Sequence, residues 1–234
     1  DKISVTSGAV VVGSLGVPIL RTGTLMSGPG TDVNERQFAE QLFLQASLLD
    51  DSFQTSVRAT LGMRLLALQG GCTSTHDGSD ADRAALVEKH PHWKLASGNI
   101  KTIKRILDKV TGYAEEARAG AADLREPFTA HVLDPVRASL ICPDPREILE
   151  TAKWLVDNGG TYGLPVVRTK NKFAGQDSSE YDGYRDLMLS VLFTGPCGLS
   201  IVGEIQLHDA RTFPLKVKMH RLYKVKRATT ASAL

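Results

Sequence analysis

The sequence predicts an α/β or α+β fold, in which helices flank a mixed β-sheet behind an N-terminal arm and a long helix. After residue 97 the expected elements run helix, strand, helix, three strands and helix, an order typical of layered domains. Before residue 97, apolar residues recur with the period of one long helix. We therefore expect a Gly-rich extended arm at residues 1–34, a helical extension with a polar loop at 35–96, and one domain at 97–234.

The composition is that of a soluble globular protein with an ordinary charge balance. Of 234 residues, 42% are hydrophobic and 23% are charged, and a net charge of +2 creates no global field for nucleic acid or membranes. No apolar run reaches the ~18 residues that span a bilayer, so we expect no membrane span. Cys72, Cys142 and Cys197 are too scattered for a disulfide framework or a metal cluster, which favours a reducing compartment. The missing initiator Met suggests a processed protein or a fragment, with an organelle interior as one option.

The long helix is expected at residues 35–69. Asp32, with Glu35 three residues later, has the spacing of a capping box at its start. Gly70 and Gly71 are typical of its end.

A second long helix is expected at residues 99–118, and it is basic on one face. Lys101, Arg105 and Lys109 follow one another at intervals of four residues, away from the apolar stripe. Such a row can hold a triphosphate, or it can be a solvated face that pairs with acids such as Glu116.

The remaining elements are a strand, a capped helix and three more strands. Asp144 as the cap, Pro145 at the first position and Glu147 at the third predict a helix that ends at Gly159. The strands are expected at residues 130–142, 165–173, 184–193 and 200–208. A basic helix at 213–227 completes the chain, and its cations suit its C-terminal dipole.

The strand at 200–208 carries an unusual polar face. Glu204, Gln206 and His208 alternate with Ile205 and Leu207, so a carboxylate, an amide and an imidazole share one side of the strand. This row marks either a functional face or plain solvent exposure.

From about Asn99 onward the chain resembles the synthetase (nucleotidyltransferase-fold) domain of the RelA/SpoT alarmone family. Five blocks carry the resemblance in the family's order: Lys101, Arg105 and Lys109; residues 132–137; residues 167–173; Gly183, Tyr184 and Arg185; and residues 204–207. The resemblance implies transfer of pyrophosphate from ATP to the 3′-hydroxyl of GDP or GTP, with Mg²⁺ as the cofactor. It covers about the last 135 residues, and residues 1–96 lie outside it.

The resemblance also implies roles for individual residues. Asp134 and Glu204 would be the catalytic carboxylates that hold Mg²⁺, and Glu204 could take the proton of the attacking hydroxyl. The alternative is two strand-end acids that pair with Arg137 and Arg185. Tyr184 would stack on guanine, or else pack on its neighbours. The full expected nucleotide-binding set is Lys101, Arg105, Lys109, Arg137, Lys170, Tyr184, Arg185, Gln206 and His208.

The chain departs from the family pattern at positions that usually carry charge or hydrogen-bond donors. Asn99 and His208 stand where the family usually has Arg, and Asp186 and Met188 stand where its guanine-binding loop usually has Ser and His. Because phosphoryl transfer depends on positive charge around the phosphates, such losses could abolish turnover and leave the fold intact.

Three functional hypotheses follow from these observations. The first is a catalytically degenerate module that serves a larger assembly as a structural or nucleotide-sensing subunit, with protein partners. The second is an active magnesium-dependent pyrophosphokinase that uses ATP and GDP or GTP. The third is an adaptor that binds RNA or protein through its basic C-terminal helix. We rank the first hypothesis slightly above the second and the third last. We expect no nucleic-acid partner, because no aromatic platform accompanies the C-terminal helix.

Overall fold

The computed structural model describes residues 31–68, 79–120, 124–173, 184–216 and 218–219. The expected arm up to residue 30, the Gly70-Gly71 helix end, most of the polar loop and nearly all of the C-terminal helix after 216 lie outside these residues.

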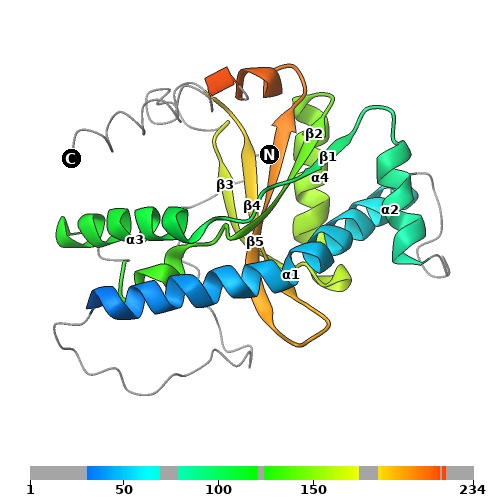
Figure 1. Ribbon diagram of the computed structural model, residues 1–234. Helices are drawn as coiled ribbons and strands as arrows, with labels where there is room; N and C mark the ends of the chain where they lie inside the picture. Colours follow the sequence, from blue (N-terminus) through cyan, green and yellow to red (C-terminus); the bar gives the residue numbers. More distant parts are fainter. Residues whose placement is uncertain (1–30, 69–78, 121–123, 174–183, 217, 220–234) are drawn as a thin grey trace.

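One five-stranded mixed sheet forms the centre of the molecule, as the sequence predicts (Figure 1). Its strands are β1 (Lys94–Ser97), β2 (Val136–Cys142), β3 (Val166–Asn171), β4 (Leu187–Thr194) and β5 (Ser200–Asp209). They lie side by side in the order β1-β2-β5-β4-β3. Only β2 and β5 run parallel, and every other neighbouring pair is antiparallel. The last strand of the described residues, β5, is therefore the central strand of the sheet.

The helices α1 (Thr31–Leu68), α2 (Asp80–Lys89), α3 (Ile103–Arg118) and α4 (Pro145–Asn158) accompany the sheet. Helix α1 runs past the sheet from α3 at one end to α2 at the other (Figure 1). Two 3₁₀ turns, η1 (Phe128–His131) and η2 (Gly159–Tyr162), precede β2 and follow α4. No helix in the described ranges has the length and apolar character to cross a membrane.

The main core lies between one face of the sheet and helices α1 and α4. Buried side chains of all three elements form one apolar cluster, to which β5 contributes Ile201, Ile205 and Leu207. Gly203 belongs to the same face, where an added Cβ would lie 2.6 Å from the ring of Phe53 on α1. Close packing at this point therefore leaves room only for glycine.

Helix caps explain where α3 and α4 begin. The Asp144 carboxylate accepts a hydrogen bond from the Glu147 amide at 2.9 Å, so α4 starts as the sequence predicts. Helix α3 begins at Ile103, later than expected, because Thr102 is its N-cap and accepts from the Arg105 amide.

Three further features differ from the sequence-based expectation. Strand β2 starts at Val136, because residues 128–131 form η1. Helix α2 and strand β1 lie inside the segment expected to hold a helix and a polar loop, and β1 extends the sheet by pairing with β2. Helix α1 begins at Thr31, so Asp32, the expected cap, lies inside the helix. The Glu35 carboxylate accepts hydrogen bonds from the Phe128 and Thr129 amides and the Thr129 hydroxyl, which ties α1 to η1.

Candidate functional site

Glu204, Gln206 and His208 lie on the face of the sheet opposite the α1/α4 core. We call this surface the Glu204 face. Their odd-numbered neighbours on β5 are buried in the core, so the period of two places the even-numbered side chains on the other side. Residues opposite one another in the register share a face, which adds Arg137 from β2 and Ser190 from β4 beside Glu204.

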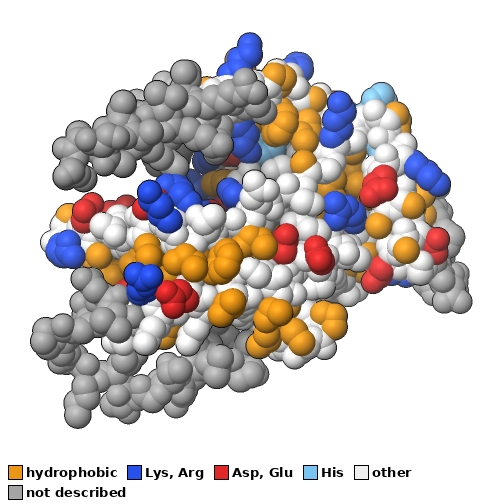
Figure 2. Space-filling model, in the orientation of Figure 1, with side chains coloured by type: hydrophobic (Ala, Val, Ile, Leu, Met, Phe, Trp, Pro, Cys, Tyr) orange, Lys and Arg blue, Asp and Glu red, His pale blue; other side chains and the backbone are white. Residues whose placement is uncertain are grey.

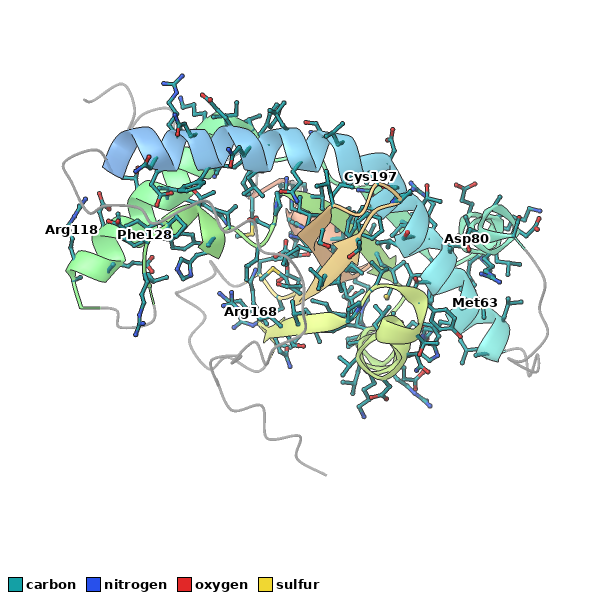
Figure 3. The ribbon with its side chains drawn as sticks, turned by 90° about the horizontal axis from the view of Figure 1, so that it is seen from below. Met63, Asp80, Arg118, Phe128, Arg168 and Cys197 are labelled. Atoms are coloured by element: carbon teal, nitrogen blue, oxygen red, sulfur yellow. The ribbon has the colours of Figure 1, made fainter. Side chains whose placement is uncertain are left out.

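The basic strand β3 continues the Glu204 face at the edge of the sheet. Arg168 is paired with Ser190, and Lys170 is paired with Met188, which is itself opposite Gln206. Figure 3 shows Arg168 on β3, far from Met63 and Asp80 at the α1/α2 end of the molecule. The sequence-based choice of Lys170 overlooked Arg168, although its alternation with Lys170 was visible in the sequence.

Asp134 lies just before β2 and forms ion pairs with two lysines. The Lys101 Nζ is 2.8 Å from Oδ2, and the Lys109 Nζ is 2.9 Å from Oδ1. Lys101 lies before the Thr102 cap rather than on α3, and its amide donates to the Pro135 carbonyl at 3.0 Å. Burial disfavours the charged form of Asp134, but the two ammonium groups outweigh it and hold the pKa of Asp134 below its usual value.

The Asp134 and Glu204 carboxylates act on one another electrostatically. Burial raises the pKa of Glu204, and the charge of Asp134 raises it further. The Gln206 amide donates a hydrogen bond to Glu204, which partly offsets this effect. The alternative pairing of these acids with Arg137 and Arg185 is not seen among the described ion pairs: Arg137 donates to the Asn99 carbonyl at 3.1 Å.

The two carboxylates fit a magnesium ion by their chemistry. Mg²⁺ usually takes only one or two protein carboxylates and fills its other positions with water and substrate phosphates. In the described part of the chain no cluster of three His, Cys, Asp or Glu side chains offers a complete metal cage. Asp134 would have to share its oxygens between the ion and its two lysines, whereas the mutual repulsion of Asp134 and Glu204 favours a cation between them.

A hydrogen-bonded cluster surrounds the buried His208. Its Nδ1 is 2.8 Å from the Tyr184 hydroxyl, and its Nε2 is 2.8 Å from the Lys216 Nζ. Burial, with Lys216 and then Lys172, lowers the pKa of His208 to about 3, so the ring is neutral and the Asp186 carboxylate 3.9 Å away forms no ion pair with it. An ammonium group can only donate, so Nε2 accepts and Nδ1 carries the proton toward Tyr184.

Lys172 and Lys216 of the Glu204 face are not among the nucleotide-binding residues predicted from the sequence. Lys172 follows β3 and pairs with Asp186 at 2.8 Å, and Lys216 lies 2.6 Å from the Gln206 Oε1. Lys216 was assigned to a solvated C-terminal helix, and residues 213–216 are indeed helical. The sequence carried no signal that this turn folds back onto β5.

The other expected nucleotide-binding residues are less closely tied to this cluster. Arg105 pairs with Asp108 at 2.7 Å on the outside of α3. Arg185 makes a long contact of 3.5 Å with the Tyr184 carbonyl. Figure 2 shows Lys and Arg side chains gathered along one side of α3, beside a hollow.

Comparison with solved structures identifies the fold. The structure of small alarmone synthetase 1 from Bacillus subtilis bound to its product pppGpp matches with a TM-score of 0.51 and 16% identity, over 79% of this chain and 80% of that one. A second structure of the same enzyme has a TM-score of 0.48 and 17% identity over 80% of each chain. Its AMPCPP complex has a TM-score of 0.45 and 18% identity, over 80% of this chain and 79% of that one. No protein-family model and no curated protein matches the chain. The chain therefore has the RelA/SpoT synthetase fold of the small alarmone synthetases, at low sequence identity.

Proposed function

We propose that the Glu204 face binds nucleotides and transfers pyrophosphate from ATP to the 3′-hydroxyl of GDP or GTP. The observation that carries the proposal is the pair of electrostatically coupled carboxylates, Asp134 and Glu204, beside Lys101 and Lys109. The match to an enzyme whose product is pppGpp adds support for a guanine nucleotide as the acceptor.

The proposed reaction forms a bond between the acceptor 3′-oxygen and the β-phosphorus of ATP. The bond from that phosphorus to the α,β-bridging oxygen breaks, and AMP leaves. Bound Mg²⁺ would neutralise charge on the transferred phosphates. Glu204 takes the proton of the 3′-hydroxyl, and its raised pKa brings its basicity closer to the working pH.

The remaining side chains bind and orient the substrates. Lys101 and Lys109 attract the ATP phosphates as well as Asp134. The ring of Tyr184, whose hydroxyl is fixed by His208, would hold a purine by stacking.

A second candidate is the degenerate nucleotide-sensing or structural module of the first hypothesis. Two observations favour this candidate. Both carboxylate oxygens of Asp134 already form ion pairs with lysines, and the Tyr184 hydroxyl is already hydrogen-bonded to His208. In that case the face would bind nucleotide without turnover.

Incubation of the full chain with ATP, GDP or GTP and Mg²⁺, followed by anion-exchange chromatography, tests the proposal. We expect AMP and a guanosine tetra- or pentaphosphate from the wild type, and none from Glu204→Gln. Glu88→Gln, on α2 with a side chain that is 71% exposed, is the matched control and should retain activity. Nucleotide binding without any product would favour the nucleotide-sensing module. The absence of both product and binding would reject the enzyme and the nucleotide-sensing module, and would leave the structural module.

A further inference from the structure

Lys216 differs from Lys101, Lys109 and Lys172 in its partners. Those three each pair with an aspartate at 2.8 or 2.9 Å. The Lys216 Nζ instead contacts two neutral acceptors, the Gln206 Oε1 and the His208 Nε2. Among the residues that the structure describes, no carboxylate forms an ion pair with Lys216. Its charge is therefore balanced by no direct counter-ion there.

A largely buried ammonium group without a counter-ion is energetically unfavourable. Burial lowers the pKa of Lys216 to about 8, although the more distant charges of Asp186 and Glu204 favour the protonated form. Lys172 and Arg137 add repulsion. At neutral pH the group is still protonated, so the fold maintains a cation where a neutral side chain would be less costly. Such an arrangement is expected where an anionic ligand completes the site.

The position of Lys216 separates it from the lysines of Asp134. Its contacts Gln206 and His208 lie two and four residues beyond Glu204 along β5, whereas Asp134 lies just before β2. Its Nζ lies 6.0 Å from the centroid of the Tyr184 ring. The Glu204 face thus has two cationic groups at Asp134 and another cationic group beside Tyr184.

We propose that Lys216 binds a phosphate of the acceptor nucleotide, at the Tyr184 end of the Glu204 face. The inference rests on the proposed function for the identity of the ligand, but the anion site itself rests on the unpaired cation and its two neutral contacts. Lys216 would then supply positive charge close to His208, which stands where the resembled family usually carries an arginine.

Binding measurements on the full chain test this role. Isothermal titration with GDP, guanosine, pyrophosphate and AMPCPP is compared for the wild type, Lys216→Met, Lys216→Arg and Lys218→Met. Lys218 is an exposed lysine two residues further along, so its variant controls for net charge. We expect Lys216→Met to weaken GDP about tenfold or more, because one charged contact is lost. Guanosine should be unaffected, AMPCPP should change less than about threefold, and Lys216→Arg should retain part of the GDP affinity.

The arms of this experiment separate the two proposals. Equal GDP affinity in the wild type and Lys216→Met would overturn the inference and leave the proposed function standing. Pyrophosphate binding that is lost in Lys216→Met, with no guanine nucleotide bound by the wild type, would keep the anion site and reject the proposed function. Loss of guanosine binding as well would indicate a structural effect and overturn the inference, and no binding of any ligand would overturn both.

Discussion

Asp134→Asn should destabilise the folded chain by about 2–3 kcal/mol at neutral pH. The Lys101 side chain is only 7% exposed and the Asp134 side chain 13%, so the substitution leaves a nearly buried ammonium group without its carboxylate. Loss of one partner of a buried pair costs about 3–5 kcal/mol. We place the effect somewhat below this range, since Lys109 is 34% exposed and since the repulsion between Asp134 and Glu204 disappears.

Urea denaturation of the purified chain measures this difference. The matched control is Asp108→Asn, which breaks an exposed ion pair with Arg105 on α3. Its loss should lower the free energy of unfolding by less than about 0.5 kcal/mol. A double-mutant cycle with Lys101→Met should give a coupling energy of about 1 kcal/mol or more. If Asp134→Asn is no more destabilising than Asp108→Asn, the two lysines do not depend on Asp134 for their charge balance.

The pH dependence of the same difference has a defined sign. The pKa of Asp134 is lower in the folded state than its ordinary value, because of Lys109 and Lys101 acting against burial. Its stabilising effect is therefore fully present above the unfolded pKa of about 3.9 and is lost as the pH falls through the folded pKa. The gap between wild type and Asp134→Asn should narrow over that acidic range.

Three further outcomes are expected. Gly203→Ala should lower the free energy of unfolding by about 2 kcal/mol or more, because the added methyl overpacks the core. Gly112→Ala, which has open space around it on α3, should raise the free energy of unfolding by up to about 1 kcal/mol. The midpoints of urea denaturation measure both changes. Glu35→Ala should cost about 2–3 kcal/mol in the same assay, since it leaves two amides and a hydroxyl without their acceptor, and a cost below 0.5 would contradict that role. In maleimide labelling with peptide mapping, exposed Cys197 should react in the native protein, whereas Cys142, which is buried and whose pKa burial raises to about 12, should react only after denaturation.

Local sequence patterns predicted the parts of the fold that local physics determines. The caps of α4 and the alternation around Glu204 depend only on residues within one turn or one pleat, so both were readable directly. The beginning of α3 was misplaced because the basic spacing of Lys101 with Arg105 looked helical, although Thr102 between them is the cap. Strand β1 gave no alternating signal, since most of its side chains are exposed at the edge of the sheet.

The candidate site was predictable in its residue types and not in its pairings. The resemblance selected Asp134, Glu204 and Tyr184, and the structure places all three at one face of the sheet or its margin. The contacts that determine their charge states come from other segments: Lys216 from the turn after β5, and Lys172 from the end of β3. Such contacts depend on how the chain folds back in space, which no spacing in the sequence encodes.

The central place of β5 has a consequence for synthesis on the ribosome. Strand β2 must wait for its parallel neighbour while α4, β3 and β4 are translated, and until then one of its edges has no native partner. A nascent chain halted before residue 200 would thus carry both an unfinished sheet and half of its carboxylate pair. Premature termination in this region should give aggregation-prone fragments rather than a smaller folded domain.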